Sequence, residues 1–252
     1  MKILMVIPAV GDIYGGTSKS VLELTEAIAN LGEDVDLITT NANGDSRLDV
    51  PLSTWIKEGK YRIQYFSYLN ILDYKFSYPL TSWVFKNVKK YCIVHTHAIF
   101  SYPLLPAYWA SQKHEIPYIS TPHGMLEPWA LAYKRSKKRL YFSLLEQPAL
   151  DKASLIHTIS STESKNVKSI KLKPPLAVIP NGIHRKDFEN LPSPEVFYQK
   201  FPITRDKTLI IFLGRIDPKK GLDLLAQAFA KANKIFSETH LIVAGQDNTG
   251  YL

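Results

Sequence analysis

The sequence predicts an α/β protein whose parallel sheet is covered by helices on both faces. Short apolar runs rich in β-branched residues, such as Ile3–Ile7, alternate with segments of helical periodicity, such as Thr17–Leu31. Repeated β-α units of this kind form parallel sheets with crossover helices on both faces. Glycines also follow several of the apolar runs, where the carboxyl ends of parallel strands bind ligands.

The first part of the chain contains most of these units. In its first helix, Val21, Leu24 and Ile28 lie on one side, and Gly32 provides the stop signal. The further strands expected here are Val35–Thr40, Tyr61–Phe66, Cys92–Thr96, Tyr118–Thr121, Leu155–Ile159 and Leu176–Ile179. The further helices expected are Thr81–Lys90, Leu104–Lys113 and a long one over about Pro128–Leu150.

The pattern changes after residue 182. Pro192, Pro194 and Pro202 occur among mixed charges with no clean period, which is typical of a linker. We therefore predict an N-terminal Rossmann-like domain over residues 1–185, a linker over 186–204 and the start of a second domain over 205–252. A strand over Thr208–Leu213, a helix from Leu222 and a strand over His240–Ala244 make up this second series.

Composition narrows the classes of partner. The chain has 252 residues and a net charge of +8, which indicates acidic partners. No nucleic-acid-binding signature is present, so nucleotides and anionic lipids rank above nucleic acid. Cys92 is the only cysteine, which excludes an internal disulfide and indicates a reducing, cytoplasmic location. No apolar stretch approaches the roughly 18–20 residues of a bilayer span.

The turn Gly214–Gly221 is the most informative segment. A strand ends in Gly214 and Arg215, two lysines follow at Lys219 and Lys220, and a helix begins after the second glycine. Free N–H groups, the positive end of the helix dipole and a guanidinium suit a pyrophosphate. An ordinary loop with solvated lysines is the alternative interpretation of this turn taken alone.

A second glycine-rich loop, Gly11–Thr17, follows the first strand and opens the first helix. Gly15 and Gly16 allow close approach of the backbone to a ligand. The loop lacks the G-x-G-x-x-G spacing of dinucleotide sites. A merely flexible connection remains open.

Three histidines stand where strands end. His95 and His97 share one strand face, and His123 with Gly124 follows the next predicted strand. Three imidazoles at one sheet edge could hold a metal, but no carboxylate or cysteine completes the set. We favour a hydrogen-bonding or acid/base role for His123 in a cleft. Asn181, after Pro180, is explained by turn chemistry alone or by a role at the hinge.

The segment Tyr133–Tyr141 carries five cations flanked by aromatic residues: Lys134, Arg135, Lys137, Lys138 and Arg139. Such a segment suits an anionic membrane surface at the inner face of the membrane. A solvated helix face is the alternative.

Taken in chain order, the motifs form a recognisable set. They are Gly15-Gly16-Thr17, His123-Gly124-Met125, Ser160 to Glu163 after a strand, Ile179-Pro180-Asn181-Gly182-Ile183, and Gly214-Arg215 with Lys220-Gly221. Over nearly the whole chain, this set closely resembles the retaining glycosyltransferases of family 4. The resemblance implies a GT-B fold, in which two Rossmann-like domains face each other across a cleft, here with the second only partly present.

The resemblance also implies roles for single residues. Arg215 and Lys220 would neutralise the diphosphate of a nucleotide-sugar and stabilise the leaving nucleotide, without a metal or other cofactor. His123 would contact the donor sugar as a catalytic residue. The remaining donor-site and phosphate-site residues implied are Gly15, Gly16, Asn181, Gly214 and Lys219, and the acceptor-side residues are Thr17, His97 and Glu127.

The implied reaction moves a hexosyl unit, with UDP-glucose as the expected donor, to a saccharide or lipid-linked saccharide acceptor with retention. It would belong to polysaccharide or glycoconjugate biosynthesis. A sugar-nucleotide epimerase of the same fold and a non-catalytic glycan-binding remnant are the alternatives.

Two departures from the family pattern stand out. His184 replaces the acid that usually follows Asn-Gly-Ile, and the family's paired glutamates would lie beyond Leu252. We therefore expect this chain to be part of a longer enzyme and inactive by itself.

Overall fold

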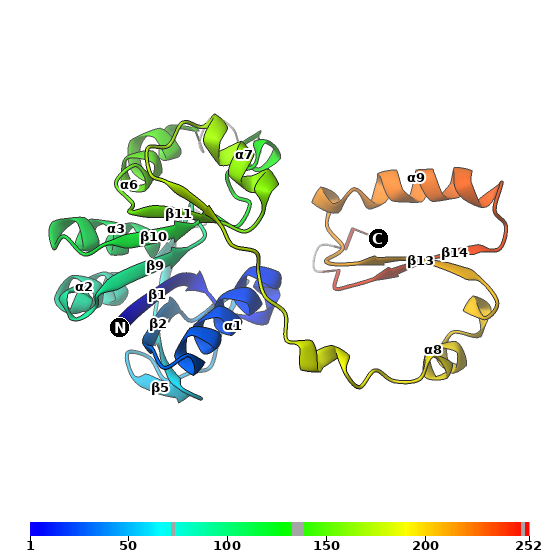
Figure 1. Cartoon of the computed structure of the whole chain (residues 1–252), viewed down its shortest axis with the longest axis horizontal. Helices are drawn as coiled ribbons and strands as arrows, with labels where there is room; N and C mark the ends of the chain where they lie inside the picture. The colour runs from blue at the N-terminus through cyan, green and yellow to red at the C-terminus, as the bar shows by residue number, and fades with distance from the viewer. Residues whose placement is uncertain (72–73, 133–138, 248–249, 252) are drawn as a thin grey trace. The chain divides into compact units, whose positions relative to one another are not determined.

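A computed structural model describes residues 1–71, 74–132, 139–247 and 250–251, arranged in two compact units (Figure 1). Unit 1 comprises Met1–Gly182 and unit 2 comprises Ile183–Leu252. The boundary between the two units follows Gly182, near residue 185, where the N-terminal domain was predicted to end. The last strand of unit 1 ends at Val178, shortly before Pro180 and Gly182.

Unit 1 is built on one eight-stranded sheet in the order β12-β11-β10-β9-β1-β2-β6-β5. The strands are β1 (Lys2–Ala9), β2 (Asp34–Thr40), β5 (Trp55–Glu58), β6 (Tyr61–Phe66), β9 (Ile93–His97), β10 (Tyr118–Thr121), β11 (Leu155–Thr158) and β12 (Leu176–Val178). All neighbours pair in parallel except β5, which pairs antiparallel with β6. The predicted strands of this half are confirmed, and only β5 was missed in this sheet.

Helices cover both faces of this sheet. Successive side chains of β1 point to opposite faces and are apolar, so both faces must be covered. Ile3 and Met5 belong to a buried cluster with Val21 of α1 (Gly16–Asn30). Leu4 and Val6 belong to the opposite cluster, which includes side chains of α2 (Tyr78–Asn87) and α3 (Leu104–Lys113). Figure 1 shows α1 on one side of the sheet and α2 and α3 on the other.

The predicted long helix over Pro128–Leu150 is described only in part. It comprises α4 (Pro128–Ala132), a π-helical segment Phe142–Glu146 and α6 (Gln147–Leu150), and residues 133–138 lie outside the described residues. Further elements not predicted are α7 (Ser161–Ser169) and the short pairs β3 (Ala42–Asn43) with β4 (Ser46–Arg47) and β7 (Leu69–Ile71) with β8 (Tyr74–Phe76).

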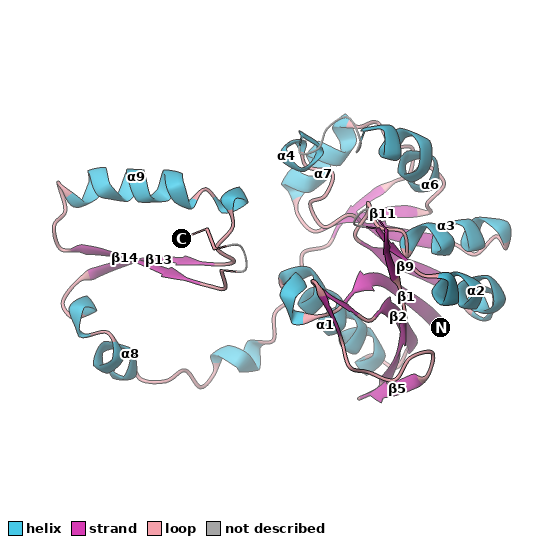
Figure 2. Ribbon diagram, turned by 180° about the vertical axis from the view of Figure 1, so that it is seen from behind, coloured by secondary structure: helices cyan, strands magenta, loops and turns pink. Residues whose placement is uncertain are grey.

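Unit 2 contains a parallel pair of strands, β13 (Thr208–Leu213) and β14 (Thr239–Ala244), with α9 (Leu222–Asn233) beside them (Figure 2). Its first residues include the segment predicted as a linker, 186–204. They form short helical turns at Arg185–Phe188 and Pro202–Thr204, and α8 (Pro194–Lys200) between them. The Ser193 side chain caps α8 and Pro194 occupies its first turn, a start signal that the sequence carried.

Candidate functional site

The sheet of unit 1 reverses its order at β1. From β1 the chain proceeds outward through β2 and β6, and it later returns to the other side of β1 to form β9, β10, β11 and β12. Open parallel sheets bind ligands outside the carboxyl ends of their strands at such a switch point. Two loops border this point. The loop after β1 leads through Gly15 to Gly16 at the start of α1, and the loop after β9 begins directly after His97.

The loop after β1 is shaped by its glycines. Gly11 packs so closely on Asn43 that an added Cβ would lie 2.4 Å from the Asn43 Oδ1 atom. Gly15 has a φ of 65°, whereas a Cβ on Gly16 would meet nothing within 4 Å. No side chain caps the start of α1, so its first N–H groups have no side-chain acceptor among the described residues.

A pocket with a volume of ≈ 430 Å³ opens at this loop. Its lining includes Gly15, Gly16, Ser18 and Lys19. Asp12 and Glu23 also line this pocket, and Lys19 forms an ion pair with Glu23 at 3.6 Å. The groups here that suit an anion are therefore the glycine N–H groups and the helix start. The predicted acceptor-side residue Thr17 lies in the first turn of the same helix and is half-buried.

Four histidines from three neighbouring strands and their loops gather at the carboxyl edge. The ring centroids of His95 and His97 lie 4.1 Å apart, those of His97 and His123 5.4 Å, and those of His95 and His157 5.7 Å. His157, at the end of β11, was missed by the sequence analysis, although it stands in the same relation to its strand as His95 and His97. No group of three or more residues suited to a metal occurs among the described residues.

Burial and the neighbouring imidazoles keep three of these rings neutral at neutral pH. Burial away from water is the larger cause, and repulsion from neighbouring imidazoles is the smaller one. Together they lower the pKa of His95 to about 3 and that of His123 to about 4. The same causes hold the pKa of His97 well below its usual value. A neutral imidazole has one N–H donor and one bare nitrogen, so their hydrogen bonds reveal which nitrogen is protonated.

A chain of hydrogen bonds assigns the tautomers of His95 and of the neutral form of His157. His157 Nε2 lies 2.8 Å from the carbonyl oxygen of Ile179, which can only accept, so Nε2 carries the proton. The bare Nδ1 then accepts from the Thr121 hydroxyl at 3.0 Å. Because that hydroxyl has donated its one proton, it accepts in turn from His95 Nε2 at 2.8 Å.

His123 is held in an unusual backbone conformation. Its φ is 52° and that of Gly124 is 74°, both in the left-handed region that non-glycine residues rarely adopt. The buried carboxylate of Glu163 holds this loop by accepting from the Gly124 N–H at 2.6 Å and the Ile159 N–H at 2.7 Å. The Ser160 side chain caps α7 by accepting from the Glu163 N–H. The S-x-x-E pattern therefore marked a helix start, and its acid also reaches across to the His123 loop.

Three other residues predicted for the site in unit 1 are Glu127, Asn181 and His97. Glu127 accepts a hydrogen bond from the Asn166 side chain at 3.1 Å and is half-buried. Asn181 is exposed, and it follows the Ile179 carbonyl that His157 binds. His97, predicted to face the acceptor, is instead fully buried, and its Nδ1 atom hydrogen-bonds to His123.

Glu146 is a buried acid that sequence reasoning missed. One of its oxygens accepts from the Phe100 N–H at 2.9 Å, which holds the strained loop after β9, where Ala98 and Phe100 both have positive φ. Neither its second oxygen nor the buried Tyr141 hydroxyl has a partner at hydrogen-bonding distance within the described part of the chain, although each of these two groups influences the pKa of the other. Burial raises the pKa of Glu146 to about 7. Its position in a π-helical segment is a feature often found at functional sites.

In unit 2, the predicted anion-binding turn lies where β13 ends. The backbone of Gly214 packs against Gly245, where an added Cβ would lie 1.8 Å from the Gly214 carbonyl oxygen. The Gly214 N–H also donates to the Ala244 carbonyl at 3.0 Å. Gly245, which the sequence analysis did not single out, is thus required by the close approach of the two strand ends.

The cations of this turn are available to a ligand. Arg215 and Lys220 are exposed, and neither forms an ion pair with any residue that the structure describes. Gly221, with a φ of 66°, precedes α9, whose start has no side-chain cap. The side chain of Lys219 lies outside the described residues. An arginine, a lysine and uncapped N–H groups at one strand end could bind a diphosphate.

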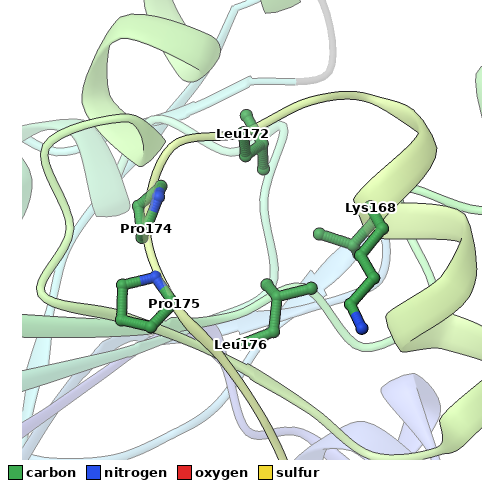
Figure 3. A pocket seen from close by; sticks show the side chains of 6 residues that line it. Lys168, Leu172, Pro174, Pro175 and Leu176 are labelled. Atoms are coloured by element: carbon green, nitrogen blue, oxygen red, sulfur yellow. The ribbon is translucent and has the colours of Figure 1, made fainter.

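A pocket of ≈ 400 Å³ lies elsewhere in unit 1, between the end of α7 and the loop into β12 (Figure 3). It is lined by Val167, Lys168, Leu172, Pro174, Pro175 and Leu176. Because β12 begins here, this pocket lies at the edge opposite the carboxyl ends. It is therefore not part of the candidate site.

The predicted membrane contact can be followed only at its end. Lys134, Arg135, Lys137 and Lys138 lie outside the described residues, and Arg139 is exposed. Leu140 and Leu144, which follow in the helical segment, are 62% and 64% exposed. In the described ranges, no helix has both the length and the apolar composition to cross a bilayer.

Comparison with known proteins agrees with this arrangement. Residues 14–187 match the sequence model described as Glycosyltransferase Family 4, and residues 195–251 match that described as Glycosyl transferases group 1. The crystal structure of Anabaena HepE in complex with UDP and glucose superimposes with a TM-score of 0.67, at 16% identity, over 99% of this chain and 62% of that one. Its likeness shows the same GT-B fold.

Two curated relatives are similar in sequence. The lipopolysaccharide 1,2-N-acetylglucosaminetransferase of Salmonella typhimurium is 33% identical over 70 residues, 28% of this chain and 18% of that protein. A human subunit of phosphatidylinositol N-acetylglucosaminyltransferase is 23% identical over 235 residues, 92% of this chain and 45% of that protein. The chain thus spans less than half the length of these two relatives.

Proposed function

Because this chain belongs to glycosyltransferase family 4, we propose that its protein transfers a hexosyl unit from a nucleotide-sugar to a saccharide or lipid-linked saccharide acceptor, with retention. The observation that carries the proposal is the turn after β13. There, exposed Arg215 and Lys220 stand without ion-pair partners among the described residues, beside the uncapped start of α9.

The chemistry assigned to this turn is electrostatic. As the bond between the sugar and the phosphate breaks, negative charge accumulates on the departing diphosphate. The Arg215 guanidinium binds two of its oxygens, and Lys220 adds a point charge. Preorganised positive groups of this kind lower the barrier without a metal ion. In unit 1, the neutral His123 is assigned to a hydroxyl of the donor sugar.

UDP-glucose is the donor that we propose. The UDP and glucose held by the Anabaena structure support it. Two curated relatives are named as N-acetylglucosamine transferases, which makes UDP-N-acetylglucosamine the second donor to test. Their names also contain a lipopolysaccharide and a phosphatidylinositol, which supports an acceptor carried by a lipid.

A lipid-borne acceptor agrees with peripheral contact at the inner face of the membrane. We assign this contact to the basic run Lys134, Arg135, Lys137, Lys138 and Arg139, followed by exposed Leu140 and Leu144. Cations bind anionic head groups, while leucines enter the interface. The free thiol of Cys92 supports a reducing, cytoplasmic location.

The experiment measures release of UDP by the intact protein with UDP-glucose or UDP-N-acetylglucosamine, with and without lipid extract as acceptor. Arg215→Ala should lower turnover by about 10²–10³, the usual effect of removing one such donor. Lys231→Ala, an exposed cation at the far end of α9, is the matched control and should leave turnover unchanged.

Two results would overturn the proposal. Full turnover in the Arg215→Ala protein would remove the diphosphate role of the turn. Conversion of the UDP-sugar without any acceptor would indicate an epimerase instead. The anomeric configuration of the product, read by NMR, tests retention.

A further inference from the structure

We propose that His97 is a positioning residue that commits the Nε2 atom of His123 to the protein and leaves the Nδ1–H of His123 to address a substrate. His97 has no exposed surface and lies at the last position of β9. Its Nδ1 atom lies 3.2 Å from His123 Nε2, which is the hydrogen bond that joins the two rings. The inference rests on the proposed function only in the role that it gives to His123.

The second nitrogen of His97 makes a purely structural role for this residue costly. Nε2 of His97 is buried and has no hydrogen-bond partner among the described residues. A buried polar atom without a partner destabilises the folded state, and an apolar residue of similar volume would avoid that penalty. Such exceptions in a native protein call for an explanation, and a functional role is one of them. The bond to His123 is the function that we assign to His97.

The proton in this bond can be assigned. Both rings are neutral at neutral pH, so one nitrogen of the pair donates and the other accepts. If His123 donated, the remaining proton of His97 would sit on the buried Nε2 without an acceptor. If His97 donates from Nδ1, its buried Nε2 is a bare nitrogen. Among backbone groups, a buried N–H without an acceptor is the rarer of these two exceptions. Applied to imidazoles, this preference makes His97 the donor.

The consequence reaches the reacting face of His123. With Nε2 accepting from His97, the proton of neutral His123 must be on Nδ1. No described residue bonds to that atom. Glu163 holds the loop backbone by accepting from the Gly124 N–H. Ring and backbone of His123 are therefore both held, and a single N–H donor is offered to a hydroxyl or an anionic oxygen of the substrate.

Nitrogen NMR of the intact protein labelled with [15N]histidine tests the assignment directly. We expect His97 and His123 to be protonated at Nδ1 and His95 and His157 to be protonated at Nε2. The resonance of His123 is identified by its loss in His123→Gln. Finding His123 protonated at Nε2 would overturn the proposal, whether or not the protein proves to be a glycosyltransferase.

Two substitutions separate the nitrogens of His97. Asn places an amide near the position of Nδ1, whereas Gln places one near that of Nε2. His97→Asn should retain the His123 tautomer and keep turnover within about threefold of the unchanged protein. His97→Gln should lose the preference of His123 for protonation at Nδ1. Its turnover should also be lower by about tenfold or more, as expected for a lost hydrogen bond between buried groups. Equal turnover in both variants, with equal thermal stability, would contradict the role.

Discussion

A single carboxylate, that of Glu163, holds the strained loop that carries His123. It is 1% exposed, and it accepts from two backbone N–H groups, those of Gly124 and Ile159. Glu163→Gln replaces one accepting oxygen by a donor, so one of these N–H groups loses its partner. We expect the free energy of unfolding to fall by about 1.5–3 kcal/mol, the range for hydrogen bonds to charged groups. Urea unfolding followed by circular dichroism measures it.

The matched control for this change is Glu115→Gln, because Glu115 is exposed. We expect it to change stability by less than about 0.5 kcal/mol. Equal effects of the two substitutions would show that the Glu163 carboxylate does not hold the loop.

At the scale of elements, the helical segment 139–150 carries the proposed membrane contact. Leu140 and Leu144 are four residues apart and both exposed, so they present one apolar stripe, and they follow the basic run in the sequence. Replacing both by Ser should weaken binding to vesicles that contain anionic phosphatidylglycerol by at least about tenfold, because each buried leucine contributes about 1.5–3 kcal/mol. Vesicle co-sedimentation measures the binding.

Leu191→Ser provides the control, since Leu191 is 69% exposed in unit 2 and far from the basic run in sequence. It should bind vesicles as the unchanged protein does. High salt should also weaken binding through screening. Binding to anionic vesicles that equals binding to uncharged vesicles and does not change with salt would contradict the assigned contact.

For the whole molecule, the buried titratable groups set the dependence of stability on pH. His95, His97 and His123 have pKa values lowered by burial, so below pH 6.5 the unfolded chain binds protons that the folded chain does not. Their contribution to stability is therefore present above pH 6.5 and declines as the pH falls to about 4 for His123 and about 3 for His95. Each histidine contributes a slope of at most about 1.4 kcal/mol per pH unit.

Glu146 acts in the opposite direction. Because its pKa is raised to about 7 from 4.5, the folded chain keeps a proton that the unfolded chain loses. Its contribution is present in acid and declines as the pH rises through about 7. Glu146→Gln should thus raise the free energy of unfolding relative to the unchanged protein at pH 8 and not at pH 5. Urea unfolding at both values measures it, and a pH-independent difference would contradict this account.

Local patterns in the sequence predicted most of the sheet. The apolar runs from Ile3–Ile7 to Leu176–Ile179 all form strands, because a strand buried on both faces needs β-branched and aliphatic residues at successive positions. Short pairs such as β7 with β8 were missed, since a few residues carry no measurable period. Two helical turns were not predicted, because prolines in a polar segment indicate a loop. Pro202 begins the turn Pro202–Thr204, and the turn Arg185–Phe188 lies between Pro180 and Pro192.

The sequence by itself determined the order of β-α units, the glycine loops and the cations after β13, because each follows from residues that are adjacent in the chain. The tertiary structure decided which of these residues meet. Only the parallel pairing of β9, β10 and β11 brings His157 to His95 through Thr121, and only the fold turns the acid of Glu163 toward Gly124. Contacts between residues far apart in sequence depend on strand order and register, and neither is written in local composition.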